Sequence, residues 1–485
     1  MALPTILVNS ATGSDTAASG AGPGTALTGT AATTDAAGTL VTLDGTPDLS
    51  GVATDGSAVV FLGDTTAGAR NFGKITAVNN IAKTVTVSNA FRISIPGGDS
   101  VDWAIGGKRA SIGGTTSAKL FSNNGAVGDA MPGWIVEMES GHAETLAAAY
   151  AIRRGGDLTD GPITLRGAIA AATPPVLTFS NNGIAIQFIG GSDGFVLSGF
   201  DLVNTNATKT ASEGVRNANN GETLPVVLHR IRIRHSTNKF WKGVVATTGT
   251  DTTILILCEI AYTASHGVDG ADDEEYEACY IHDCGGDGIV CGGAGRVRLK
   301  VHDCLIESCT GNGLLVSNSN TTTGNGGVTI RNTTFDNNAG DNLEFASAST
   351  ALLYAGLTII NCNFTRAGGY GINFSGASVT AALLHGYCAR LLHDNYGTGA
   401  MANTSGASNL TLTTPVEDGK QTVDPSYTDA ANGDFRVGTS VKALGWPTAN
   451  VGIARSHMDI GALQREEAGA GGGGLKLAGP GGLAG

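Results

Sequence analysis

The chain has 485 residues and a net charge of −13, with 73 glycines and only 15% charged residues. Glycine and proline stay below the roughly 25–30% of low-complexity disordered chains, and no Gly-X-Y period occurs, which excludes disordered and collagen-like chains. The acidic balance without a Lys/Arg cluster argues against nucleic-acid binding, and no apolar run reaches the about 18 residues of a membrane-inserting helix. The many Thr, Asn, Val and Gly residues predict an all-β protein with tight turns.

Residues 1–110 are rich in Thr, Ala, Gly and Asp and are predicted to form a small N-terminal β domain. Its clearest element is a hairpin over Gly73–Val87, where two alternating segments flank an Asn-Asn turn. Residues 111–130 follow as a capping segment, with a short helix expected over Thr116–Phe121 to cover the open end of the next domain. The first residues lack the basic region and apolar core of a secretory signal peptide, so we expect no signal peptide.

An internal repeat occupies the middle of the chain, and positions in it are numbered from an anchor residue in each copy. The anchors are Cys258, Cys279, Cys304, Thr333 and Cys362. Position +2 is always large and apolar, and position +9 is always Gly or Asn. The +2 residues are Ile260, Ile281, Ile306, Phe335 and Phe364, and the +9 residues are Gly267, Gly288, Gly313, Asn342 and Gly371. The same frame extends upstream to Phe195 and, more weakly, downstream to Gly397.

Each copy predicts three short strands, because its apolar residues come in pairs separated by two, the period of a β-strand. The pairs lie at −5 and −3, at 0 and +2, and at +10 and +12, with side chains expected to point inward. The Gly or Asn at +9 is expected to adopt a positive φ at a sharp bend. One coil cannot bury its own interior, so successive coils must stack at about 4.8 Å. Residues 131–423 are therefore predicted to form a three-faced parallel β-helix; leucine-rich repeats and propeller blades do not fit the coil length.

The cysteines fall on repeated positions, at the anchor, at +5 and at +12. Stacking places them in inward-facing columns, where free thiols act as small apolar fillers. The coil spacing also lies within the Cα range of disulfides, so bridges stay open as an alternative. No CxxC pair or convergent histidine accompanies them, and we predict no metal site and no cofactor.

Two columns of polar side chains, both expected to point outward, hold the candidate functional residues. The +3 column contains His282, Glu307 and Asp336, and the +8 column contains Asp287, Asn312 and Asp341. Because glycosidases need two carboxyl groups, Asp287, Asp341 and Glu307 are the candidate catalytic residues, and His282, Asp336 and Asn312 are candidate glycan contacts. Asp287 and Asp341 should lie about 9–10 Å apart, at the upper end of the range of inverting hydrolases. The alternative is that Asp and Asn before Gly merely form turns.

The segment Asp269–Glu277 is the densest acidic run of the chain. It is predicted to be a solvent-exposed loop, with a Ca²⁺ site as the alternative, since hard cations prefer carboxylate oxygens. It lacks the spaced acidic motif of a dedicated calcium loop. Arg296, Arg298 and Lys300 lie one coil away and suit an exposed strand face, or the basic residue that a lyase would need.

The coils, with their C-x-I-x-x-C and D/N-G-I/L turns, resemble the right-handed parallel β-helix superfamily. That superfamily includes pectate lyases, other polysaccharide lyases and hydrolases, and bacteriophage tailspikes. Residues 424–466, including Gly433–Val437 and Asp459–Gln464, resemble the closing segment that often follows the last coil of such proteins. Residues 467–485 form a Gly-rich stretch with the composition of a flexible tail.

The resemblance, together with the missing signal peptide, implies a bacteriophage virion protein assembled in the host cytoplasm. The expected function is tailspike-like host attachment through glycan binding, by a homotrimer that binds other virion proteins through its N-terminal domain and host surface polysaccharide through its coils. Two alternatives stay open: a polysaccharide depolymerase, either lyase or hydrolase, and a capsid decoration protein. Attachment is preferred over catalysis, and neither nucleic acid nor a membrane is expected as a partner.

Overall fold

The computed structural model describes most of the chain up to residue 403. The described residues are 3–13, 26–62, 72–88, 91, 101–112, 130–146, 149–152, 155–168, 173–189, 194–207, 210–218, 224–234, 239–247, 252–271, 273–292, 298–317, 327–346, 357–375, 386–389, 392–394 and 396–403. The chain divides into two compact units, residues 1–205 with 222–227 and residues 206–221 with 228 onward. The predicted helix over Thr116–Phe121, the closing segment 424–466 and the Gly-rich stretch 467–485 lie outside the described residues. None of the described residues belongs to a helix that could cross a membrane.

In the first unit, six strands form a closed barrel in the order β2-β3-β6-β5-β4-β7. They are β2 (Leu27–Thr34), β3 (Leu40–Thr42), β4 (Val59–Leu62), β5 (Phe72–Asn79), β6 (Thr84–Val87) and β7 (Val101–Ile105). Alternation along these antiparallel strands buries Val41, Val85 and Trp103 in a common core. The predicted hairpin is confirmed as β5 and β6, although Asn79 pairs with Thr84 and the turn is longer than the expected Asn-Asn. The small antiparallel β domain near the N-terminus is thus confirmed.

The remaining strands of the first unit are parallel and lie in three sheets. Sheet 1 holds β1 (Thr5–Val8), β8 (Ile135–Met138), β11 (Ile163–Gly167) and β14 (Phe195–Ser198); sheet 2 holds β9 (Ala143–Leu146), β12 (Val176–Phe179) and β15 (Asp201–Asn204); sheet 3 holds β10 (Tyr150–Ile152) and β13 (Ile184–Ile189). Strand β1 pairs with β8, so the chain forms a strand of the stack before it enters the barrel. Thr5–Val8 therefore lies in the stack, whereas the sequence analysis placed it in the N-terminal domain.

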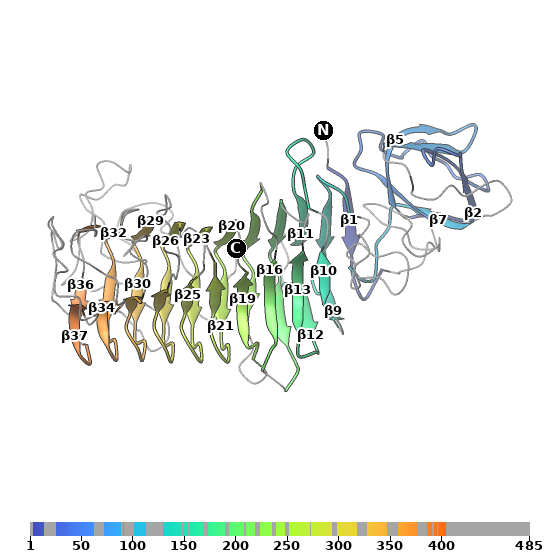
Figure 1. The fold of residues 1–485 in the computed structure, drawn as a ribbon. Coiled ribbons are helices and arrows are strands. Elements are labelled where there is room, and N and C mark those ends of the chain that lie inside the picture. The colour runs from blue at the N-terminus through green and yellow to red at the C-terminus, as the bar shows by residue number, and fades with distance from the viewer. Residues whose placement is uncertain are drawn as a thin grey trace, which may run out of the picture. The chain divides into compact units, whose positions relative to one another are not determined.

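The second unit repeats the same three-sheet pattern coil after coil (Figure 1). Sheet 1 continues with β20 (Thr252–Ile256), β23 (Asp273–Glu277), β26 (Arg298–His302), β29 (Gly327–Arg331), β32 (Leu357–Ile360) and β35 (Gly386–Ala389). Sheet 2 holds β18 (Arg232–Ile233), β21 (Glu259–Ala261), β24 (Tyr280–His282), β27 (Leu305–Glu307), β30 (Thr334–Asp336), β33 (Asn363–Thr365) and β36 (Leu392–Asp394). Sheet 3 holds β16 (Glu213–Ala218), β19 (Lys242–Ala246), β22 (Val268–Gly270), β25 (Ile289–Cys291), β28 (Leu314–Val316), β31 (Leu343–Phe345), β34 (Tyr370–Phe374) and β37 (Gly399–Asn403). Strand β17 (Val226–His229) spans the division between the two units.

The predicted strand positions and the predicted inner column are confirmed. The +2 residues pair in register from coil to coil, from Ile260 with Ile281 to Phe335 with Phe364. All of them are buried, and the Phe335 and Phe364 rings stack 5.2 Å apart and nearly parallel. Burying such a column stabilises the stack at about 25 cal/mol for each Å² of apolar surface removed from water.

The expectation of a positive φ at +9 is wrong. Gly267, Gly288 and Gly313 do not have a positive φ; a Cβ on any of them would come within 2.6–2.7 Å of a carbonyl oxygen in the next coil. Glycine is needed there because the coils approach closely. The left-handed corners lie instead at −1 and +4, in residues that are not glycine: Leu257, Ala278, Asp303, Asn332 and Asn361, and Tyr262, Asp283, Ser308, Asn337 and Arg366.

The cysteines of the described coils pack as the repeat predicts. Seven are described with their side chains, and all seven are buried thiols that form no disulfide with one another. At the anchor position, Cys279 and Cys304 donate to backbone carbonyls of the preceding coil. Burial raises the pKa of the Cys279 thiol well above its ordinary value, as expected of a thiol that serves packing.

Candidate functional site

The +3 residues His282, Glu307 and Asp336 lie side by side on the outer face of sheet 2. They end strands β24, β27 and β30, and they pair in register from one strand to the next. They are nevertheless only 4%, 7% and 0% exposed. Strand alternation does turn them away from the core, but neighbouring side chains pack over them. The Tyr280 ring stacks on His282, and Arg366 covers Asp336.

His282 is held between two acidic residues. Its Nδ1 lies 2.8 Å from Oδ2 of Asp283, and its Nε2 lies 3.6 Å from Oε1 of Glu259. Nε2 is buried and has no hydrogen-bond partner among the described residues. Burial lowers the pKa of His282, but its contacts with Asp283 and Glu259 outweigh burial and raise the pKa to about 9. The imidazole is therefore positively charged at neutral pH.

Glu307 lies on the next strand, β27, and its surroundings favour the neutral form of its side chain, whereas those of His282 favour the charged form. Burial raises its pKa to about 7, although the hydrogen bond from Tyr280 and the charge of His282 act to lower it. The Tyr280 hydroxyl donates to Oε1 of Glu307, and no described residue hydrogen-bonds the other oxygen, Oε2. Near neutral pH, a substantial fraction of Glu307 therefore carries a proton.

Glu259 completes the group on strand β21, one strand before Tyr280. Its side chain is 15% exposed, and its Oε1 accepts a hydrogen bond of 3.1 Å from Nη1 of Arg234. Burial acts to raise the pKa of Glu259, but His282 and Arg234 outweigh it, and the pKa is lowered. Near neutral pH, Glu259 is therefore ionised, whereas Glu307 is partly protonated. We refer to Glu259, Tyr280, His282, Asp283 and Glu307 as the Tyr280 cluster.

Asp336 is already occupied by neighbouring side chains. Its Oδ1 accepts hydrogen bonds from Thr365 Oγ1 at 2.6 Å and from Arg366 Nε at 2.9 Å, and Arg366 Nη2 contacts its Oδ2. A carboxylate bonded in this way positions Arg366, whose side chain is 40% exposed, more than it offers oxygens to a ligand. The glycan contact expected at Asp336 stays a prediction.

The +8 residues form a ladder along the same coils. Each side chain accepts a hydrogen bond from the backbone N–H at +8 of the next coil. Asp287 N donates to Nδ1 of His266, Asn312 N to Oδ1 of Asp287, Asp341 N to Oδ1 of Asn312, and Tyr370 N to Oδ1 of Asp341. One oxygen of Asp287, Asn312 and Asp341 is therefore occupied by a backbone N–H of the next coil, and not by the local turn that the alternative expected. Of the remaining oxygens, Oδ2 of Asp287 faces His266 at 3.2 Å, and Oδ2 of Asp341 accepts from Asn373 at 2.7 Å.

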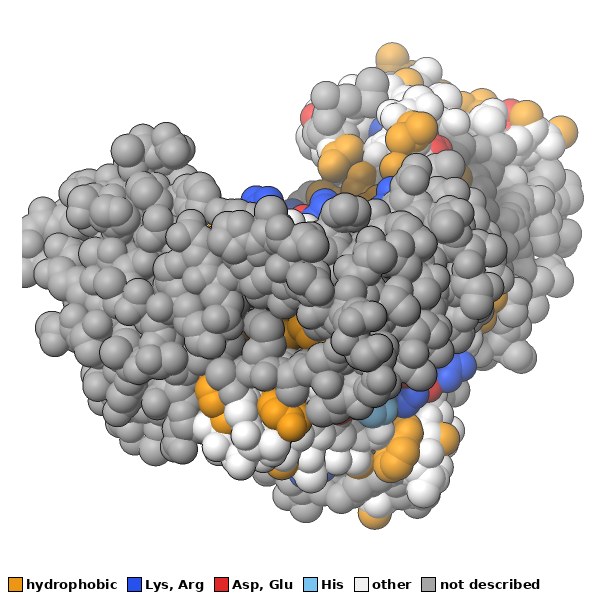
Figure 2. Space-filling view, turned by 60° about the vertical axis from the view of Figure 1, so that its left-hand side comes forward, with side chains coloured by type: hydrophobic (Ala, Val, Ile, Leu, Met, Phe, Trp, Pro, Cys, Tyr) orange, Lys and Arg blue, Asp and Glu red, His pale blue; other side chains and the backbone are white. Residues whose placement is uncertain are grey.

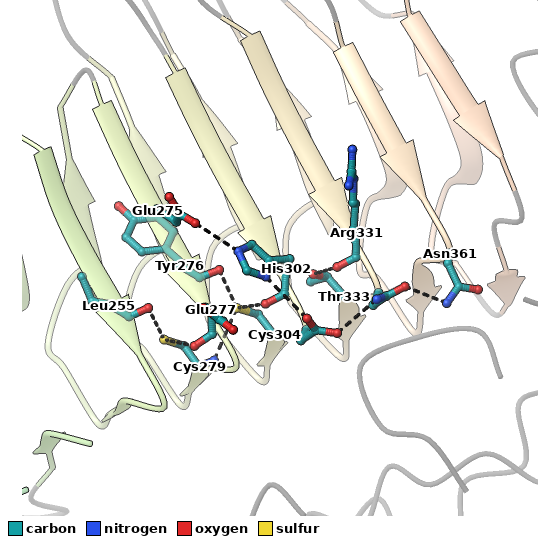
Figure 3. Close-up of polar contacts among 12 residues, drawn as sticks. Leu255, Glu275, Tyr276, Glu277, Cys279, His302, Cys304, Arg331, Thr333 and Asn361 are labelled. Atoms are coloured by element: carbon teal, nitrogen blue, oxygen red, sulfur yellow. Dashed lines mark hydrogen bonds and ion pairs between the residues drawn. The ribbon is translucent and has the colours of Figure 1, made fainter. Parts of the chain in front are cut away.

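The acidic segment Asp269–Glu277 is not a loop, because it contains β22 and β23. Asp273 and Glu275 of β23 form ion pairs with Arg298 and Lys300, their register partners on β26. Figure 3 shows Glu275 and His302 pointing toward one another across these strands, at 3.4 Å. In the described parts of the chain, no group of three or more His, Cys, Asp or Glu side chains could hold a metal ion. The basic side chains of β26 therefore neutralise Asp273 and Glu275 of β23.

Sequence reasoning missed Glu259, Tyr280 and Asp283, because it treated +3 and +8 as the outward positions. Positions +1 and +4 flank +3 on the same outer face, and the sequence does place Glu and Tyr at +1 in adjacent coils. This pair of Glu and Tyr at the same position of adjacent coils is the sequence signal that could have pointed to the site. Figure 2 shows one face of the molecule, on which a histidine lies beside acidic and basic side chains of the described residues.

The comparisons with known proteins concern the fold. A family model described as a right handed beta helix region matches residues 176–326 and 214–383, and no curated protein matches the chain. Pectate lyase Pel9A is similar at 12% identity over 69% of this chain and 89% of its own, with a TM-score of 0.40.

Two further solved structures are similar at comparable levels. The catalytic domain of a GH87 alpha-1,3-glucanase in complex with nigerose has 11% identity over 84% of this chain and 93% of its own, with a TM-score of 0.33. ORF18 of Geobacillus virus E2 has 13% identity over 62% of this chain and 54% of its own, with a TM-score of 0.27. Two of these neighbours are carbohydrate-acting enzymes by name. The fold of this chain is the predicted right-handed parallel β-helix.

Proposed function

We propose that the protein binds a polysaccharide along the outer face of sheet 2, across strands β21 to β33. The observation that carries the proposal is the Tyr280 cluster, in which a charged imidazole, an ionised carboxylate and a partly protonated carboxyl group lie on adjacent strands. Titratable groups with strongly shifted pKa values gather at functional sites more often than elsewhere. Charged and hydroxyl groups arranged in rows suit a ligand that repeats hydroxyl groups along its length.

Aromatic rings support a sugar ligand over a small polar ion. Tyr262 at the +4 corner lies edge-on to the His282 ring at 5.5 Å, and Tyr280 stacks on the same ring at 3.9 Å. The flat apolar face of a sugar ring packs on such a surface, while its hydroxyls reach the tyrosine and acid side chains at the ring edges. Arg366, held by Asp336, extends the same face by two strands.

The place of action is a second element of the proposal: display on a virus particle, as a homotrimer assembled in the host cytoplasm. The division into a small antiparallel barrel and a long coil stack supports it, because one part can bind other virion proteins while the other binds host polysaccharide. Attachment is the preferred role, and capsid decoration is compatible with the same two-part design. Immunogold labelling of the phage particle tests display, and mass measurement of the purified protein in solution tests the trimer.

Glycan binding is tested with a microarray of bacterial capsular and lipopolysaccharide glycans, followed by calorimetric titration of the glycans that bind. Tyr262→Ala should weaken binding about tenfold or more, since stacked aromatic residues dominate such contacts. Lys300→Ala on sheet 1 serves as the matched control, because it removes an exposed side chain from a different face. Absence of binding to every glycan on the array, or equal losses in both variants, would contradict the proposal.

A further inference from the structure

We infer that the Tyr280 cluster hydrolyses the polysaccharide that it binds, with Glu307 as the proton donor to the glycosidic oxygen and Glu259 as the base that activates water. The inference rests on the proposed function, because it needs a glycan on sheet 2. It predicts an inverting reaction with ordinary saturated sugar ends as products.

The two acids lie on either side of strand β24. Glu259 pairs with Tyr280, and Tyr280 pairs with Leu305, two residues before Glu307. Two strand spacings and this offset put the backbones of the two acids about 12 Å apart, whereas inverting hydrolases hold their carboxyl groups about 6.5–9.5 Å apart, so both side chains have to reach toward β24. Both side chains reach the middle strand β24, where Glu259 lies 3.6 Å from His282 and Glu307 accepts from Tyr280. Each carboxyl group thus reaches a side chain of the strand that separates the two acids.

The two acids also have matching free oxygens. Oε1 of Glu307 is used by Tyr280, and Oε1 of Glu259 is used by Arg234. Among the described residues, none hydrogen-bonds Oε2 of either side chain. One oxygen of each acid is thus fixed in place, while the other stays available for a substrate or a water molecule.

The opposite environments of the two acids assign their roles. Where surroundings push the pKa values of two neighbouring acids apart, the acid of higher pKa donates the proton and the ionised one acts as base. Glu307 is raised to about 7 by burial, and Glu259 is lowered by His282 and Arg234. The groups around Glu307 that set this balance are the Tyr280 hydroxyl, which donates a hydrogen bond, and the charged side chains of His282, Asp336 and Asp283.

The reaction balances as the addition of one water molecule. Glu307 gives its proton to the glycosidic oxygen as the bond from that oxygen to the anomeric carbon breaks. Glu259 takes a proton from water as the water oxygen bonds to the same carbon from the opposite side. One sugar leaves as an alcohol and the other as an inverted hemiacetal, and solvent returns the proton from Glu259 to Glu307.

His282 lies between the acids as a positioning residue. Its unpartnered Nε2 is buried and faces Oε1 of Glu259 across 3.6 Å, which leaves room for that hydrogen bond to tighten when a glycan arrives. Its positive charge keeps Glu259 ionised. The pair Asp287 and Asp341 suits the reaction less well, because Oδ1 of each accepts a backbone N–H of the next coil.

The experiment uses the full chain and every array glycan that the wild-type protein binds, and it measures new reducing ends and the anomer of the first product by NMR. Glu307→Gln and Glu259→Gln should each lower hydrolysis by about 10²–10⁴-fold while glycan binding is retained. Glu275→Gln on sheet 1 is the control that should keep full activity. Circular dichroism and thermal melting confirm that each variant is folded.

Tyr280→Phe provides a second, independent readout. It keeps the stacked ring but removes the hydrogen bond that lowers the pKa of Glu307, so the alkaline limb of the pH–rate profile should move to higher pH. A merely structural tyrosine would lower activity without moving that limb.

The outcomes separate the two proposals. Glycan binding without new reducing ends would overturn hydrolysis and leave the proposed function intact, whereas failure to bind any glycan would overturn both. Unsaturated sugar ends, retained anomeric configuration, or full activity in a folded Glu307→Gln variant would each overturn the assignment of roles.

Discussion

Two columns of polar side chains follow the same coils only five positions apart, yet they make different kinds of contact. At +8, Asp287, Asn312 and Asp341 each accept a backbone N–H from the next coil. At +3, His282 and Glu307 contact other side chains, namely Asp283, Glu259 and Tyr280. The residue types are nearly the same, so composition alone does not separate the two columns.

The difference teaches where chemistry can arise in a coil stack. A side chain that accepts a backbone N–H of the next coil joins successive coils and contributes to the stack directly. A carboxylate buried among other titratable groups has a shifted pKa and retains a free oxygen. Substitutions in each of the two columns test this difference.

The largest expected effect is on the pH dependence of stability. The pKa of Glu307 rises from 4.5 to about 7 on folding, so its contribution to stability is lost as pH rises from about 4.5 to 7. The pKa of His282 rises from 6.5 to about 9, so its contribution is full below 6.5 and is lost as pH rises toward 9. Each loss is on the order of 3 kcal/mol, and urea unfolding across this pH range measures it.

Substitutions separate the two pH windows. Glu307→Gln should flatten the fall in unfolding free energy between about pH 4.5 and 7, and His282→Gln should flatten the fall above that. The groups that face them and could contribute are Glu259, Tyr262, Tyr280, Asp283, Asp336 and Arg366. An unchanged slope in a folded Glu307→Gln variant would show that Glu307 titrates near its ordinary pKa.

The second prediction concerns Asp336, the fully buried member of the +3 column. Asp336→Ala should lower the unfolding free energy by roughly 2–3 kcal/mol, because Thr365 Oγ1 and Arg366 lose their acceptor. Arg366 is 40% exposed and can turn to water, which limits the loss. The double variant with Arg366→Ala should lose less than the sum of the single variants, as contacting residues do. Simple additivity would show that the pair contributes little.

The third prediction concerns Asp341, which joins two coils in the +8 ladder. Asp341→Ala removes the acceptor for the Tyr370 N–H at 2.6 Å and for Asn373 Nδ2 at 2.7 Å, and should cost roughly 1–2 kcal/mol. Asp341→Asn keeps an acceptor for Tyr370 and should cost less. Neither variant should change glycan binding or hydrolysis. A loss of hydrolysis in both variants at full stability would return the catalytic assignment to the +8 column.

The architecture could be predicted from the sequence because the repeat records it directly. A strand period of two and a fixed offset between copies determine which residues face inward, and Ile260, Ile281 and Ile306 pair as expected. The corners could not be predicted in the same way. Positive φ falls on residues such as Leu257 and Ala278, which give no sequence signal for a left-handed conformation.

Only part of the candidate site could be predicted from the sequence, for a similar reason. The sequence places His282 and Glu307 on one column, but their burial depends on how Tyr280 and neighbouring side chains pack over them. Side-chain packing across strands shifts pKa values by desolvation, which no spacing rule captures. The acidic segment was misassigned because pairing of Glu275 with Lys300 lets a charged stretch form a strand.

The smallest predicted effect lies on sheet 1, where the charges face water. Lys300 Nζ lies 3.0 Å from Oε2 of Glu275, but the two side chains are 59% and 29% exposed. Exposed pairs of this kind contribute about 0–1 kcal/mol, and Glu275 keeps a second partner in His302 at 3.4 Å. Lys300→Ala should therefore change the unfolding free energy by less than about 1 kcal/mol, and added salt should reduce that difference further because it screens surface charges. A larger, salt-independent loss would mean that the Lys300 stem packs on the sheet, and sheet 1 would then resemble the buried face of sheet 2 more than its ion pairs suggest.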